Sequence, residues 1–180
     1  MSKKIIAAAA LAAAALPASA QGFYADAGYT FVNIDYDVAG QSGEIDLGAV
    51  GGHVGYDFNE WFALEGEAAV GVSDEEASIA GVSAKLELNY IVGAFARANL
   101  PINEQFRLYG RVGAVNAEVE GSATGGGFNF AESSSDSGVG YGAGAELMVS
   151  SQFGVRGDYT RYDIEDIEAD AFTVAAVFKF

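Results

Sequence analysis

Short segments in which apolar residues occupy every second position recur along this chain, and they limit its fold more than any other feature. The clearest example is Ala171–Phe180, where every second residue from Phe172 to Phe180 is apolar. A period of two is typical of a β-strand that presents one face to an apolar environment. The chain is therefore predicted to be all-β.

Eight such segments follow the first 20 residues. They are Phe23–Tyr36, Asp46–Phe58, Trp61–Val72, Ala84–Leu100, Phe106–Ala117, Ser137–Val149, Phe153–Tyr162 and Ala171–Phe180. The connections between them alternate between short turns and longer stretches, which are Asp37–Ile45, Ser73–Ser83, Glu118–Asp136 and Asp163–Asp170. We expect the longer stretches to be loops, and the Gly- and Ser-rich Glu118–Asp136 to be a mobile one. Short turns at one end and long loops at the other are typical of outer-membrane barrels.

The two faces of these segments differ in charge. One row is almost free of charge, as in Leu86, Leu88 and Tyr90 of the fourth segment. The opposite row holds Asp26, His53, Asp57, Glu65, Glu67, Lys85, Glu87, Arg97, Arg107, Arg111, Glu146, Arg156, Asp158 and Lys179. A soluble barrel would turn the apolar row inward, whereas a membrane barrel would turn it toward lipid.

The aromatic residues favour the membrane barrel. They gather on the apolar row near short turns and chain ends, where a membrane interface is expected, whereas a soluble core would hold its large residues at mid-strand. These residues are Phe23, Tyr56, Phe58, Phe62, Phe106, Phe153, Phe178 and Phe180. Because lipid cannot hydrogen-bond an open strand edge, the first and last strands must pair. We therefore predict a closed eight-stranded antiparallel up-and-down transmembrane β-barrel over residues 21–180.

Residues Met1–Ala20 have the form of a cleavable signal peptide. Lys3 and Lys4 precede the apolar run Ile5–Leu16, and small residues follow it at Ala18–Ala20. The run is too short for a transmembrane helix, which takes about 20 residues. Cleavage after Ala20 would leave 25 acidic residues against 7 basic ones. Such a surface repels nucleic acid, and the absence of cysteine excludes disulfides and thiol chemistry.

Several short motifs recur in one known group of proteins. They are Gly22–Gly28 (GFYADAG), Gly55–Phe58 (GYDF), Leu108–Gly113 (LYGRVG), Tyr141–Glu146 (YGAGAE), Arg156–Tyr162 (RGDYTRY) and the terminal Phe178-Lys179-Phe180. With them, the chain resembles the small eight-stranded outer-membrane barrels of the OmpA-like type, found in Gram-negative bacteria.

The resemblance implies a monomer in the bacterial outer membrane that contacts outer-membrane lipid and lipopolysaccharide. It also implies passage through periplasmic chaperones and the outer-membrane assembly machinery, with Phe178 and Phe180 as the assembly signal. The fold itself does not fix the function, because related barrels are structural proteins, adhesins, small channels and a few enzymes.

The candidate functional residues are the charges expected at mid-depth in the barrel. They are Glu65, Glu67, Arg97, Arg111, Arg156 and Asp158. An eight-stranded barrel is about filled by its own side chains, and buried charges are stabilised by pairing. We therefore expect an interior polar network, with Glu65 and Arg97 as neighbours. The alternative is that these charges line a small conducting channel.

No cofactor, metal site or enzymatic activity is predicted. His53, the single histidine, has no serine at a telling spacing and no Gly-x-Ser-x-Gly sequence accompanies it. The glycines of Gly138–Gly144 lie inside a strand and feed no helix, so they form no phosphate site. The acidic loops match no calcium-binding loop. We expect a structural or surface-interaction role with an unknown surface partner. The alternatives are a low-conductance channel, a lipid-modifying enzyme and a soluble periplasmic ligand-binding barrel.

Overall fold

The computed structural model describes residues 22–38, 41–79, 82–125, 128–165 and 167–180, so the expected signal peptide lies outside the described residues. The strands are β1 (Phe23–Val38), β2 (Gln41–Asp57), β3 (Phe62–Gly71), β4 (Asp74–Ile79), β5 (Val82–Pro101), β6 (Phe106–Gly125), β7 (Phe128–Met148), β8 (Phe153–Ile164) and β9 (Ile167–Lys179). In this part of the chain, no helix is long and apolar enough to cross a membrane.

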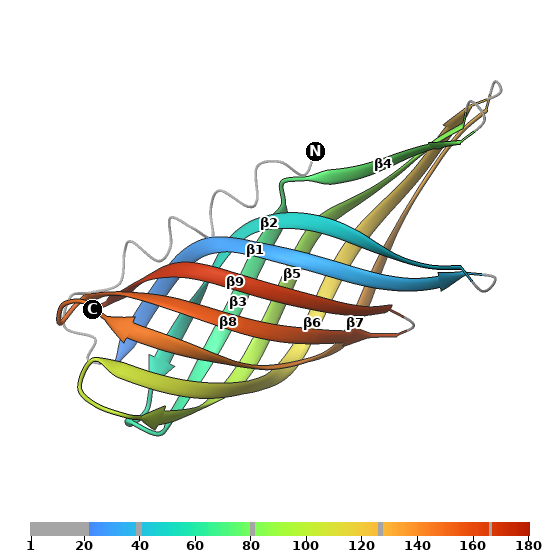
Figure 1. The fold of residues 1–180 in the computed structure, drawn as a ribbon. Helices are drawn as coiled ribbons and strands as arrows, with labels where there is room; N and C mark the ends of the chain where they lie inside the picture. The colour runs from blue at the N-terminus through green and yellow to red at the C-terminus, as the bar shows by residue number, and fades with distance from the viewer. Residues whose placement is uncertain (1–21, 39–40, 80–81, 126–127, 166) are drawn as a thin grey trace.

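The strands form one closed antiparallel sheet (Figure 1). Closure comes from β1 and β9, which pair from Tyr24 opposite Lys179 to Ile34 opposite Ala169. β3 and β4 follow one another along β5 and share one place in the circle, so eight strands surround the lumen. The predicted eight-stranded barrel is confirmed.

The third wall strand breaks at Val72 and Ser73. The backbone N–H of Val72 donates to Gly48 O at 2.8 Å, and the Gly48 N–H donates to Ser73 Oγ at 2.5 Å. Beyond this break, among the described residues, β4 is paired with β5 alone. β4, β5, β6 and β7 then run past the other strands toward the upper right of Figure 1.

The prediction that the four long connections are loops is wrong for most of their residues. In Glu118–Asp136, for example, the β6–β7 ladder continues from Glu118 opposite Ser135 to Gly125 opposite Phe128. The reason is that these hairpins stand outside the lipid, where both faces of a strand tolerate polar residues. The hydrophobic alternation that reveals a strand is lost there, although backbone pairing continues.

The outer face of the barrel is apolar, as expected for the membrane alternative. Phe31, Leu64 and Phe172 are each more than half exposed on this face. At the end with the short turns, the rings of Phe153 and Phe178 lie 4.9 Å apart and those of Phe178 and Phe180 lie 5.0 Å apart. These aromatics form the expected girdle at one membrane interface.

One stretch of β5 departs from the predicted alternation. The β5–β6 register shifts between Leu88 and Tyr90, which makes Asn89 the extra residue of a β-bulge. Leu88, predicted to face lipid, is therefore buried in the lumen and only 4% exposed. Lys85 and Glu87, predicted to point inward, keep partly exposed side chains that pair at 3.1 Å. Period two cannot reveal a bulge, because one extra residue exchanges the two faces beyond it.

Candidate functional site

The lumen contains a connected set of buried charges. The six that the sequence singles out come from β3, β5, β6 and β8, which the circular sheet brings around one cavity axis. They are Glu65, Glu67, Arg97, Arg111, Arg156 and Asp158, and none is more than 8% exposed. Charges this deeply buried are costly unless each has a partner.

Glu65 is at the centre of this set. Its Oε1 accepts a hydrogen bond from Tyr24 Oη at 2.7 Å. The same oxygen accepts from Arg97 Nη1 and from Arg156 Nη1, each at 2.8 Å. Because β3 and β8 occupy opposite places in the circle of strands, the Glu65–Arg156 pair crosses the lumen.

A second group lies nearer the short turns and centres on Glu146. Its Oε2 accepts from Arg97 Nη2 at 3.0 Å and from Arg107 Nη2 at 2.8 Å. Its Oε1 pairs with Lys179 Nζ at 3.1 Å. Arg107 also pairs with Asp57 at 3.1 Å. Arg97 thus connects this group to Glu65.

Arg156 connects the centre to Asp158 and Asp26. Its Nε donates to Asp158 Oδ2 at 3.1 Å and its Nη1 donates to Asp26 Oδ2 at 2.9 Å. Tyr109 Oη also donates to Asp158, at 3.0 Å. The guanidinium carbon of Arg97 lies 3.7 Å from the centre of the Tyr109 ring. The Tyr109 ring thus adds a cation–π contact to the carboxylate pairs that Arg97 already makes.

The third group surrounds His53 on the far side of the centre from the short turns. His53 Nδ1 lies 2.8 Å from Asp26 Oδ1, and its Nε2 lies 3.0 Å from Glu67 Oε2. Arg111 pairs with Glu67 and also reaches His53 Nε2 at 2.8 Å. Tyr162 Oη donates to the other Glu67 oxygen at 2.6 Å. Both ring nitrogens of His53 are therefore engaged within the network.

Sequence analysis did not single out the tyrosines Tyr24, Tyr109 and Tyr162 as members of the network. Their positions carry the signal, because each shares the inward row of its own strand with charged residues. Tyr109, for instance, lies between Arg107 and Arg111 at a spacing of two. A search for charged residues alone passes over phenol groups that complete the hydrogen bonds.

Two glycines of β7 make room for large inward rings. A Cβ at Gly144 would lie 2.5 Å from the Tyr109 ring, and one at Gly140 would lie 2.8 Å from the Phe95 ring. These glycines are thus a packing requirement of the filled lumen. A Cβ at the other two alternating glycines, Gly138 and Gly142, would instead meet the backbone of β8 at Asp163 and Tyr159. Close packing thus accounts for all four glycines without any phosphate site.

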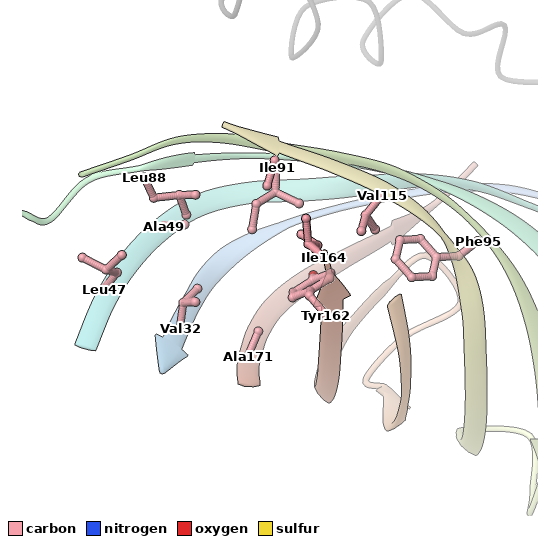
Figure 2. Close-up of a cluster of buried hydrophobic side chains, with 11 residues drawn as sticks. Val32, Leu47, Ala49, Leu88, Ile91, Phe95, Val115, Tyr162, Ile164 and Ala171 are labelled. Carbon is pink, nitrogen blue, oxygen red and sulfur yellow. The ribbon is translucent and has the colours of Figure 1, made fainter. Parts of the chain in front are cut away.

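Beyond the His53 group the lumen becomes apolar, which the sequence analysis did not predict. A buried hydrophobic cluster fills the barrel on the side of the long hairpins. It consists of Val32, Leu47, Ala49, Leu88, Ile91, Phe95, Val115, Ala117, Tyr162, Ile164 and Ala171. Figure 2 shows these side chains gathered inside the curve of the strands. The guanidinium carbon of Arg111 lies 3.8 Å from the centre of the Phe95 ring, where the charged and apolar layers meet.

Little empty space remains between the two layers. A cavity of about 10 Å³ lies there, lined among others by His53, Glu67, Ile91 and Tyr162, which is room for about one water molecule. Within the described ranges, no cluster of three or more His, Asp or Glu side chains is arranged to hold a metal ion. The geometry therefore supports packing and charge pairing across the lumen.

Comparisons with known proteins agree with this architecture. The chain matches the family model described as the outer membrane protein beta-barrel domain over residues 5–180. A comparison with curated proteins gives no match.

Several solved structures have the same fold. Ail, the attachment invasion locus protein of Yersinia pestis, in complex with the heparin analogue sucrose octasulfate, is 22% identical with a TM-score of 0.62. The match covers 89% of this chain and 99% of that one. Neisserial surface protein A (NspA) is 17% identical with a TM-score of 0.58, over 89% and 98% of the two chains. OprG from Pseudomonas aeruginosa is 12% identical with a TM-score of 0.55, over 89% and 96%. At these identities the likeness concerns the fold.

Proposed function

The chain belongs to the outer-membrane β-barrel domain family and resides in the bacterial outer membrane, and from this premise we propose a structural or surface-contacting protein whose lumen is closed by its own side chains. The closed lumen is the part of this proposal that the geometry supports most directly. The rival it must exclude is a small channel of low conductance.

One observation carries the proposal, namely that the central arginines are bound to carboxylates on several other strands. Arg97 on β5 holds Glu65 on β3 and Glu146 on β7. Arg156 on β8 holds Glu65 and also Asp26 on β1. An ion that passed along the axis would have to displace these pairs and then cross the apolar cluster. Both steps oppose conduction, because hydrophobic constrictions exclude ions as well.

Planar-bilayer recording tests the closed lumen. We expect the purified, folded protein to give no steady and reproducible openings. The double substitution Arg97→Ala with Phe95→Ala, which opens both layers, should give measurable conductance. The lipid-facing substitution Leu64→Ala is the matched control and should stay silent. Reproducible openings in the unsubstituted protein would instead assign it to the small channels.

We assign no reaction to the protein. His53 is the natural candidate for a general base, but its two ring nitrogens are engaged by Asp26 and Glu67 inside the lumen. A lipid-modifying enzyme would need a nucleophile and a base near the outer rim. Lipid A from cells that overproduce the protein should therefore keep its normal acylation, and a new acylation pattern would assign an enzyme.

We also propose that Phe178 and Phe180 act as the assembly signal for the outer-membrane machinery, and that the folded protein is a monomer in contact with lipid and lipopolysaccharide. Phe180 N–H donates to Phe23 O at 3.1 Å, so the final residue lies beside the first strand. Replacing Phe178 and Phe180 by Ala should reduce the heat-modifiable, folded form in the outer membrane. Phe172→Ala, on the same outward row of β9, is the control and should assemble normally.

A further inference from the structure

The outward row of β7 changes character partway along the strand. From Leu147 to Val139 it is apolar, and from Ser137 to Ser133 it consists of serines. A transmembrane β-strand needs about 9–11 residues, whereas β7 has 21. The segment Phe128–Ser137 therefore stands outside the membrane, on the side of the long hairpins.

This segment has one unpaired edge. β8 begins to pair with β7 at Gly138, opposite Ile164. Within the described part of the chain, Phe128–Ser137 pairs with β6 and with no strand on its other side. Such an edge presents backbone N–H and C=O groups that can hydrogen-bond an added strand. Proteins normally keep exposed edges short or cover them, so a long free edge calls for an explanation.

The charge around this edge is negative. The exposed acidic residues here are Glu120 on β6, Glu132 on β7, Asp163 on β8 and Glu165 in the β8–β9 turn. The basic Arg161 nearby is already paired with Asp170 at 3.1 Å and with Glu168. A second copy of this chain would bring like charges together along the edge, which is unfavourable. A polyanion would be repelled for the same reason.

We propose that the free edge of β7 binds an extended, positively charged segment of a partner protein, which adds to the sheet as a further strand. This inference rests on the surface-contacting role proposed above. Strand addition takes its affinity from main-chain hydrogen bonds and its selectivity from alternate side chains. On one face of β7, Phe130 and Glu132 are neighbours at a spacing of two, and both are exposed. The bound segment should therefore place a basic residue beside Glu132 and an apolar one beside Phe130.

A variant without the edge can be designed from the register. Glu120 lies directly opposite Ser133, so replacing Gly121–Glu132 by Asn-Gly would join the two by a two-residue hairpin turn. This change removes the outer half of the free edge, Phe128–Glu132, together with the Phe130 and Glu132 side chains, and leaves the transmembrane ladder intact. A heat-modifiable shift on gels would verify that the shortened protein is folded.

The test is the binding of a labelled peptide to the folded full-length protein in lipid nanodiscs, followed by fluorescence anisotropy. One face of the peptide, when extended, alternates lysine with valine to match Glu132 and Phe130, and its other face is threonine. We expect this peptide to bind, and the same peptide with glutamate in place of lysine to show no binding. A lysine peptide interrupted by a central proline keeps most of its charge but cannot add as a continuous strand, so it should lose most of its affinity.

The variants then locate the site. The shortened hairpin should abolish binding, and Glu132→Lys should weaken it roughly fivefold, as expected for one cross-strand charge pair. Glu104→Lys, the same change at an exposed short turn on the opposite membrane side, should have no effect. The proposal is overturned if the lysine peptide does not bind, or if it binds the shortened and proline-interrupted forms equally well. Either result would leave the closed lumen to be judged separately by the conductance recording.

Discussion

Removing the carboxylate of Glu65 should destabilise the barrel more than any comparable change on its lipid-facing surface. Glu65 is 0% exposed, and its Oε1 accepts hydrogen bonds from Tyr24, Arg97 and Arg156. In Glu65→Ala, the two arginines keep only their other carboxylate partners. Breaking a buried ion pair by removing one member costs about 3–5 kcal/mol, and we expect a loss of that size.

Glu65→Gln separates the charge from the packing. The amide keeps the size of the side chain and an oxygen acceptor, so the loss should be smaller than for Glu65→Ala. The charge-assisted hydrogen bonds become neutral-acceptor bonds, which are roughly half as strong. The double substitution of Glu65 and Arg97, compared with each single one, then measures the coupling between these two residues.

The assay is equilibrium unfolding by urea in phospholipid vesicles. Trp61, the single tryptophan, is 47% exposed beside a short turn, so its fluorescence reports the loss of the membrane-bound fold. The matched control is Leu64→Ala, because Leu64 lies on the same strand, faces lipid and is 53% exposed. If Glu65→Ala lowered the free energy of unfolding no more than Leu64→Ala, the lumen charges would be hydrated individually and the network argument would fail.

Two further predictions test the packing of the lumen and the bulge in β5. Gly140→Ala should lower the free energy of unfolding because its Cβ would meet the Phe95 ring, and adding Phe95→Leu should restore part of the loss. Gly110→Ala is the control and should have little effect, because no atom would lie closer than 3.8 Å to its Cβ. Urea unfolding measures all three variants. Since the chain has no cysteine, single cysteines report exposure directly. Glu87→Cys should react with a water-soluble maleimide and Leu88→Cys should not, and the opposite result would place the β-bulge elsewhere.

The barrel itself could be predicted because lipid imposes one simple pattern over its whole outer surface. In the middle of β3, lipid-facing positions such as Leu64 alternate with the buried charges Glu65 and Glu67. Period two, closure and the terminal aromatics follow from that single constraint. The direction in which the charged row points also follows, because a charge facing lipid would be expensive.

The parts that could not be predicted depend on distances between strands or on residues outside the lipid. To predict the contact between Glu65 and Arg156, one must know the diameter of the barrel and the relative stagger of β3 and β8. Neither quantity can be read from the sequence of a single strand. The bulge at Asn89 involves a single extra residue with no characteristic side chain. The hairpins that were expected to be loops carry no hydrophobic alternation, since water lies on both of their faces.

The level at which the membrane ends accounts for both layers of the lumen. Within the lipid, the outer row is apolar and the inner row is charged. Above it, the outer row of β6 becomes polar at Asn116 and Glu118, while the inner row becomes apolar at Val115 and Ala117. The hydrophobic cluster straddles this change. The same strands thus follow the inverted rule of a membrane barrel below the boundary and the ordinary rule of a soluble β-protein above it.

This exchange has an electrostatic consequence for the network. The apolar cluster separates the His53 group from the water at the open hairpin end, so the ion pairs below it lie in a medium of lower dielectric than an open pore would give. Coulombic attraction between paired charges increases as the dielectric constant falls. The free-energy cost of leaving Arg97 or Arg156 without a partner increases for the same reason. The apolar layer therefore strengthens the pairing of the charged layer, and the two layers close the lumen together.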